Sequence, residues 1–180
     1  MRFFYWIWIL GLVACENSDH VLTDWTRNVQ LREEASQVES YLSQGGSLRA
    51  KLLAPKMYRV SDDTIYSEFP KTLHCDFFNS AKQLESKLDS KYGIYYESLN
   101  RVFLRDSVVV VTIKGDTLMT QQLWWDQNTK LFSTDAPVTF KSADKRIYAA
   151  KGLEATQDLT RITFRETVGK LRVNEGGMPF

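Results

Sequence analysis

The chain has 180 residues, of which 43% are hydrophobic and 13% aromatic, so a domain with a packed core is expected and wholesale disorder is not. Lys and Arg together number 23 against 22 Asp and Glu, which gives a formal net charge of +1. This balance argues against a nucleic-acid-binding protein, because such proteins normally carry a clear basic excess. The 2 Cys and 2 His are too few for a disulfide-rich scaffold or a Cys/His zinc site.

The first fifteen residues form an apolar leader. Arg2 precedes an apolar run from Phe3 to Ala14, roughly half the ~20 residues that span a bilayer, which matches a secretory signal peptide. The end of the run, Leu12-Val13-Ala14-Cys15, resembles the lipobox of bacterial lipoproteins, whose cysteine is acylated before the peptide is cut. The resemblance implies lipidation of Cys15 and attachment to a membrane surface; the alternatives are an uncleaved short anchor and a chance cysteine at the end of an ordinary signal peptide. Cys75 would then have no partner within the chain and is expected to be a buried thiol, with an intermolecular disulfide bridge as the alternative.

The composition and hydrophobic pattern divide the rest of the chain into a polar tether over residues 16–35 and a body of short predicted strands from about residue 36. Turn signals such as Lys114-Gly115-Asp116 separate runs rich in β-branched and aromatic residues. Within them, Val108–Ile113 is almost entirely β-branched and suits a strand buried on both faces. The runs expected to be strands are Leu48–Tyr58, Tyr92–Tyr96, Arg101–Ile113, Leu118–Trp125, Lys130–Phe140, Arg146–Ala150 and Arg161–Glu166.

Two longer patterns in the sequence are a helix-like spacing of apolar residues and a weak internal repeat. In Ser80–Tyr92 the apolar residues recur at spacings of three and four, which by itself favours a helix. A weak internal repeat with an offset of 29 residues aligns Tyr96–Val109 with Trp125–Val138; each copy has an aromatic-acid pair, a turn, a strand, a polar corner and a second strand. The repeat predicts stacked β-units of similar construction.

No constellation of catalytic residues is recognisable. His74 is followed directly by Cys75, and neighbours on a strand point to opposite faces, so they cannot work as a catalytic pair. The acidic doublets Glu33-Glu34 and Asp62-Asp63 lie in polar, turn-like surroundings, and the glycine pairs are isolated. We therefore expect a protein that is not an enzyme and has no cofactor or metal.

Several segments, in a characteristic order, closely resemble the LptC family, the periplasmic component of the lipopolysaccharide export transporter. The likeness covers roughly residues 36–173. The segments that carry it are Gly46–Leu52, Tyr92–Tyr96, Gly115–Thr120, Leu123–Asp126, Phe132–Val138, Ile147, Lys151–Ala155 and Asp158-Leu159.

The resemblance implies an all-β fold over residues 36–173: a β-jellyroll of two facing antiparallel sheets, open at its ends, with 174–180 as a tail. It replaces the helix at Ser80–Tyr92 by strands. It also implies a location on the periplasmic side of the inner membrane of a Gram-negative bacterium. There the domain would accept lipopolysaccharide from an inner-membrane ABC transporter and pass it to a bridge protein of the same jellyroll type.

Site residues follow from this implied fold. The first strand region, with Gly46, Leu48 and Ala50, is expected to face the transporter, and the last strands, from Phe164 through Leu171 to Val173, the next bridge protein. Plain core packing is the alternative role for the groove, and a scaffold that binds partners through strand edges without carrying lipid is the alternative function. The residues expected to line an apolar groove are Val109, Val111, Leu123, Trp125, Val138, Phe140 and Phe164.

Overall fold

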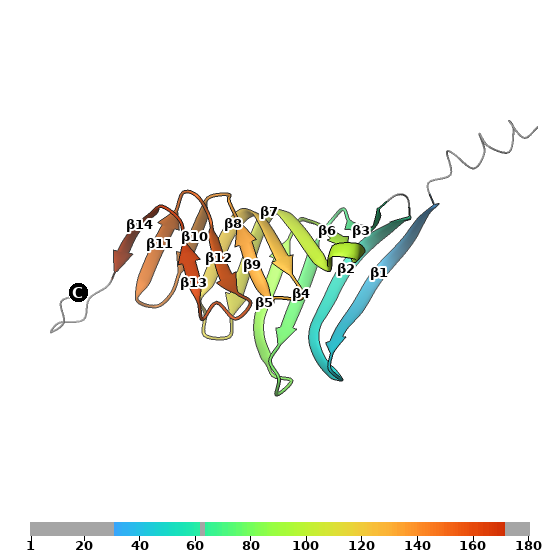
Figure 1. Cartoon of the computed structure of the whole chain (residues 1–180), viewed down its shortest axis with the longest axis horizontal. Helices are drawn as coiled ribbons and strands as arrows, with labels where there is room; N and C mark the ends of the chain where they lie inside the picture. Colours follow the sequence, from blue (N-terminus) through green and yellow to red (C-terminus); the bar gives the residue numbers. More distant parts are fainter. Residues whose placement is uncertain (1–30, 62–63, 172–180) are drawn as a thin grey trace, which may run out of the picture. The chain divides into compact units, whose positions relative to one another are not determined.

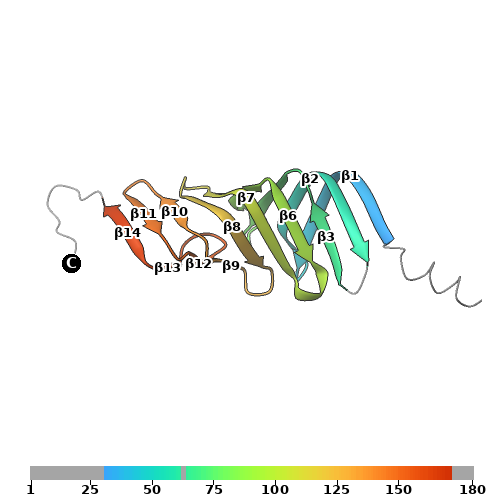
Figure 2. The same cartoon turned by 90° about the horizontal axis from the view of Figure 1, so that it is seen from above.

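The computed structural model describes residues 31–61 and 64–171, which form fourteen β-strands and one short 3-10 helix, η2 (Glu97–Leu99) (Figures 1 and 2). Within these ranges, no helix has the length and hydrophobicity to cross a membrane. The strands are β1 (Leu31–Gln44), β2 (Ser47–Ser61), β3 (Ile65–Phe69), β4 (Leu73–Phe78), β5 (Leu84–Ser90), β6 (Tyr92–Tyr96), β7 (Arg101–Thr112), β8 (Thr117–Asp126), β9 (Leu131–Thr134), β10 (Val138–Lys141), β11 (Lys145–Ala149), β12 (Leu153–Thr156), β13 (Ile162–Phe164) and β14 (Thr167–Leu171).

The strands form two antiparallel sheets that share their longest members. Sheet I runs from residues 58–61 of β2 through β3, β6, the first half of β7 and the second half of β8 to β9, β12 and β13. Sheet II runs from residues 50–53 of β2 through β4, β5, the second half of β7 and the first half of β8 to β10, β11 and β14. Strand β1 pairs with β2 along nearly its whole length.

The long strands pass from one sheet to the other at bends. In β7 the bend lies at Asp106 and Ser107, whose φ angles are 65° and 60° and which coincide with a shift in the register against β8. The corner 135–137, between β9 and β10, performs the same crossing. These two crossings are the polar corners of the 29-residue repeat, so the repeat corresponds to a unit that begins in sheet I and ends in sheet II.

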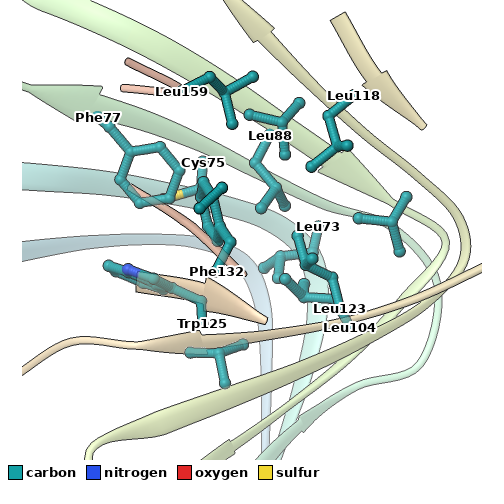
Figure 3. Close-up of a cluster of buried hydrophobic side chains, with 14 of the residues drawn as sticks. Leu73, Cys75, Phe77, Leu88, Leu104, Leu118, Leu123, Trp125, Phe132 and Leu159 are labelled. Atoms are coloured by element: carbon teal, nitrogen blue, oxygen red, sulfur yellow. The ribbon is translucent and has the colours of Figure 1, made fainter. Parts of the chain in front are cut away.

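The core lies between the two sheets. Period-two alternation along the strands turns one face of each sheet inward, and burial of each large apolar side chain stabilises the fold by about 1.5–3 kcal/mol. At its centre the Phe77 ring makes edge contacts with Trp125, at a centroid distance of 4.8 Å, and with Phe132, at 5.7 Å (Figure 3). Apolar side chains with at most 1% exposure are Phe77, Leu88, Leu104, Val108, Val110, Leu118, Leu123, Phe132, Val138, Ala149, Leu153 and Ala155.

A turn between β12 and β13 inserts Leu159 into this core, where it lies near Leu88 and Leu118 (Figure 3). The turn is tied to both sheets: the Ser86 hydroxyl donates to the Gln157 carbonyl at 2.9 Å, and the Gln157 N–H donates to the carbonyl of Lys130 at 3.1 Å. Leu159 has a φ of 55°, an uncommon conformation for leucine, which its packing and the hydrogen bonds of the turn hold in place.

Asp158 gives this turn a predictable pH dependence. Burial opposes its ionisation, but hydrogen bonds from Thr156 and Thr160 outweigh burial and lower the pKa of the carboxyl below its ordinary 3.8. The ionised Asp158 carboxylate therefore contributes its full stabilisation of the folded protein at pH values above the ordinary pKa of 3.8. This contribution is lost as the pH falls through the lower pKa of the folded state. We expect wild type to exceed Asp158→Asn in unfolding free energy by up to about 1 kcal/mol at neutral pH, and the gap to narrow near pH 3, as measured by urea denaturation. An equal gap at both pH values would contradict this role.

The all-β prediction is confirmed, including strands rather than a helix within Ser80–Tyr92, where the structure has β5 and then β6. Other boundaries need correction. Strand β1 begins at Leu31, within the predicted tether, and Lys130–Phe140 is two strands, one in each sheet, separated by the corner 135–137. The expectation that Val108–Ile113 is buried on both faces is wrong, because Ile113 is 68% exposed and only one face of β7 meets the core.

Cys75 and His74 lie on opposite faces of β4, as predicted. Cys75 is a free thiol that is 3% exposed, and burial, followed by the nearby charge of Asp76, raises its pKa. His74 lies on the outer face of sheet II. The buried thiol therefore contributes to the core as a small apolar side chain.

Candidate functional site

The space between the two sheets is filled at its centre and hollow towards its ends. Near β1 it opens into a largely apolar cavity of about 280 Å³. Both sheets contribute to the walls, together with β1. Strand β1 is the outermost strand at the N-terminal end of the row (Figure 1). Its apolar lining residues are Val38, Tyr41, Leu42, Ala50, Leu52, Met57, Phe69, Cys75, Tyr95, Val102 and Trp125.

A second hollow of about 580 Å³ lies towards the C-terminal end. Phe140 from sheet II and Phe164 from sheet I face each other there, with ring centroids 5.8 Å apart. Leu159 and Ile162 are further apolar residues of its lining, and polar residues of the turns that follow β4, β7, β10 and β12 line it as well. Such a hollow can take an apolar chain inside while polar groups stay at the rim.

The predicted groove residues divide into three groups. Trp125, Phe140 and Phe164 line the hollows. Leu123 and Val138 face the same interior but are 0% and 1% exposed and belong to the filled centre.

Val109 and Val111 are the third group, and the expectation that they face the groove is wrong. In the second half of β7 the buried valines are Val108 and Val110, so Val109 and Val111 lie on the outer face of sheet II and are half-buried there. The physical reason is the period of two along a strand: an assignment shifted by one residue places every side chain on the opposite face.

The predicted partner-binding residues lie at the two ends of the row of strands, except where the structure does not describe them. Gly46 lies in the exposed two-residue turn between β1 and β2, where Gly45 and Gly46 have φ angles of 59° and 72°, typical of a tight hairpin turn that favours glycine. Leu48 is half-buried, whereas Ala50 is 3% exposed, so its side chain is part of the core rather than of a surface. Leu171 ends β14, and Val173 and Cys15 lie outside the described residues.

Unpaired strand edges lie at both ends of this row. Among the described residues, β1 pairs only with β2, β13 only with β12, and β14 only with β11. The free backbone N–H and C=O groups of such edges can bind a strand of another protein. Val168 on β14 is 75% exposed, so an apolar side chain is also accessible on this edge strand.

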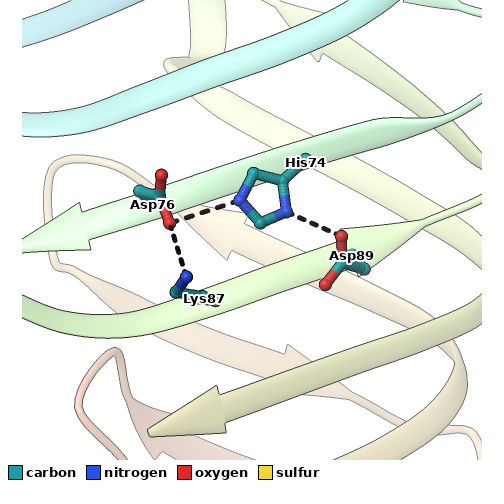
Figure 4. Close-up of polar contacts among 4 residues, drawn as sticks. All are labelled: His74, Asp76, Lys87 and Asp89. Atoms are coloured by element: carbon teal, nitrogen blue, oxygen red, sulfur yellow. Dashed lines mark hydrogen bonds and ion pairs between the residues drawn. The ribbon is translucent and has the colours of Figure 1, made fainter. Parts of the chain in front are cut away.

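The outer face of sheet II carries a polar cluster centred on His74 (Figure 4). Its Nδ1 lies 2.7 Å from Asp89 and its Nε2 lies 3.2 Å from Asp76, which Lys87 approaches at 3.9 Å. A neutral imidazole has only one N–H, so both contacts are hydrogen bonds only when the ring is protonated. No nucleophile among the described residues takes part in these contacts, so the cluster links β4 to β5 rather than forming a catalytic group.

Sequence reasoning missed several residues of the interior. Leu159 gave no signal, because a single leucine within a polar turn does not reveal that the turn folds inward. Val38 lies on β1, which none of the predicted strands covers, and Met57 lies within the predicted strand Leu48–Tyr58 but was not assigned to the groove. Arg49 lies beside a register shift between β1 and β2, where alternation does not predict the direction of a side chain.

Two facing antiparallel sheets that exchange long strands and leave strand edges free at both ends define a β-jellyroll of the open-ended type. A family model described as lipopolysaccharide-assembly, LptC-related, matches residues 27–170 of this chain. The chain therefore belongs to the LptC family, whose role is in lipopolysaccharide transport in the periplasm of Gram-negative bacteria and which is a transport family rather than one of enzymes. None of the curated proteins matches the chain.

Proposed function

We propose that this protein accepts lipopolysaccharide from an inner-membrane ABC transporter, holds its acyl chains between the two sheets, and passes it to a second jellyroll. The observation that carries this proposal is the pair of hollows at the two ends of the interior, lined by Trp125 at one end and by Phe140 and Phe164 at the other. Removing acyl chains from water provides the driving force, and sugars can remain at the polar rims.

The free strand edges support a place within a series of similar domains. A strand of the transporter would add to β1, and a strand of the next jellyroll would add to β13 or β14, so that the interiors align end to end. The centre of the interior is filled, so transfer requires the sheets or the Leu159 turn to move apart while lipid passes. The energy would come from ATP hydrolysis by the transporter. Acylation of Cys15 would hold the chain at the membrane.

The test is photocrosslinking of the full chain to purified lipopolysaccharide. A p-benzoylphenylalanine probe in place of Phe164 should yield a lipopolysaccharide adduct, because this residue lines the C-terminal hollow. The same probe in place of Met119, which is 37% exposed and pairs with Val109 on the outer face of β7, is the matched control. Equal adducts at both positions, or none at Phe164 in a folded protein, would contradict lipid carriage and favour a scaffold that binds only through strand edges.

A further inference from the structure

A charged pocket of about 590 Å³ adjoins the apolar cavity. It lies between the sheets where the end of β1 and the β4–β5 turn approach the β8–β9 and β12–β13 turns. Leu42, Trp125 and Gln127 line both the cavity and this charged pocket. They therefore mark a boundary at which the lining changes from apolar to charged.

Two buried hydrogen-bond donors at the charged pocket have no acceptor among the described residues. One is the indole Nε1–H of Trp125, a residue that is 5% exposed, and the other is the Nε–H of Arg49. A buried donor without an acceptor is unfavourable, and most such groups in folded proteins are paired. A ligand that brings oxygen atoms to this boundary would supply the missing acceptors.

The charges of the pocket indicate what kind of oxygen-bearing group the ligand would carry. Three cationic side chains line it, those of Arg49, Lys130 and Arg161, and within residues 31–61 and 64–171 none of them lies within 4.0 Å of a carboxylate. Two carboxylates oppose them: Asp158, which is bonded within its own turn, and Glu85. Three cations and two anions leave an excess of positive charge, which favours an anionic group.

We propose that the charged pocket binds a phosphate group of the glycolipid, with Arg49 and Trp125 donating to its oxygens. The inference rests on the proposed function, since the lipid's acyl chains would occupy the adjoining cavity. The phosphates that lipid A carries on its sugars lie close to its acyl chains, as this boundary requires. Arg49 gives a charge-assisted hydrogen bond, and Trp125 adds a donor of fixed direction.

The experiment compares lipid A with its enzymatically dephosphorylated form. The full chain, held in phosphatidylcholine nanodiscs, carries a p-benzoylphenylalanine probe in place of Leu131, another residue of the charged pocket. We expect wild type to form the adduct with phosphorylated lipid A at a concentration about tenfold or more below that needed for the dephosphorylated form. Arg49→Met should remove most of this preference and leave the dephosphorylated adduct within about twofold of wild type. Trp125→Phe, which also changes the wall of the apolar cavity, should likewise reduce the ratio between the adducts of the two lipids.

Trp124→Phe is the matched control, because this neighbouring tryptophan packs against Tyr96 and Phe103 outside the charged pocket; its preference should equal that of wild type. A preference that survives in both Trp125→Phe and Arg49→Met would overturn the phosphate assignment while lipid carriage stands. Loss of adduct with both lipids in wild type would overturn the proposed function, and this inference with it. If inorganic phosphate, added at the same concentration as the lipid, abolishes the preference for phosphorylated lipid A, the pocket would be assigned to free phosphate instead.

Discussion

Replacement of Gly152 by alanine is expected to destabilise the domain by about 4 kcal/mol or more. Gly152 has a φ of 78°, and a Cβ atom added there would lie 1.9 Å from the carbonyl oxygen of Thr134 and 2.8 Å from the Cα of Asp135. Both contacts are with backbone at the corner between β9 and β10, so no flexible side chain can yield. The variant would have to separate β12 from β9, which pair directly in sheet I. Urea denaturation followed by circular dichroism measures the loss.

Gly115→Ala provides the matched control for this prediction. Its φ of 87° is similarly strained for alanine, but no atom lies within 4 Å of the added Cβ. We expect a loss of about 1–3 kcal/mol from backbone strain alone. If Gly152→Ala unfolds at the same urea concentration as Gly115→Ala, the close approach of these two backbone segments is not present in the folded protein.

Leu123→Asp should abolish cooperative folding. Phe164→Asp should stay folded but lose most of its lipid binding. Leu123 is 0% exposed in the filled centre, and an unpaired carboxylate there would lose several kcal/mol of solvation. Phe164 is half-buried beside a hollow, so its carboxylate can reach water while making the wall polar. We expect Phe164→Asp to cost about 1–2 kcal/mol in unfolding free energy and to lower the lipopolysaccharide adduct about tenfold or more.

The measurement combines urea denaturation with crosslinking from a probe in place of Ile162, which lines the same hollow. Thr163→Asp is the control, because this exposed residue alternates with Ile162 and Phe164 on β13. A folded Leu123→Asp that no longer binds lipid would show that the centre is an open groove. Unchanged adducts in Phe164→Asp would remove this hollow from the lipid path.

Local pattern predicted many of the strands but none of β1, β3, β4 and β12. Tyr92–Tyr96 was predicted with its observed bounds, and β7 and β8 within one residue, because their β-branched and aromatic runs end at clear turns. Ser80–Tyr92 shows the limit of local pattern: its spacing of leucines suits a helix, yet β5 pairs with β4 and β7, and this tertiary pairing decides the outcome.

The candidate site was less predictable because it depends on which face of each strand turns inward. Along β8 the side chains of Leu123 and Trp125 do face inward, but along β7 the inward face was assigned one residue off, to Val109 and Val111. A run of four consecutive valines offers no polar residue to mark the outer face, so its orientation is set by pairing with β5 and β8. Arg49 and Leu159 depend on a register shift and a turn, which alternation does not describe.

The most direct test of lipid carriage is photocrosslinking in living cells with the probe in place of Trp125. We expect an adduct with lipopolysaccharide that forms when the transporter hydrolyses ATP and is lost when an ATPase-inactive transporter replaces it. Such an adduct would show that lipid passes between the sheets at the boundary of cavity and charged pocket. Absence of lipid adducts both there and at Phe140, with the protein folded and present at normal amounts, would contradict this account and leave an envelope scaffold whose interior is only a core.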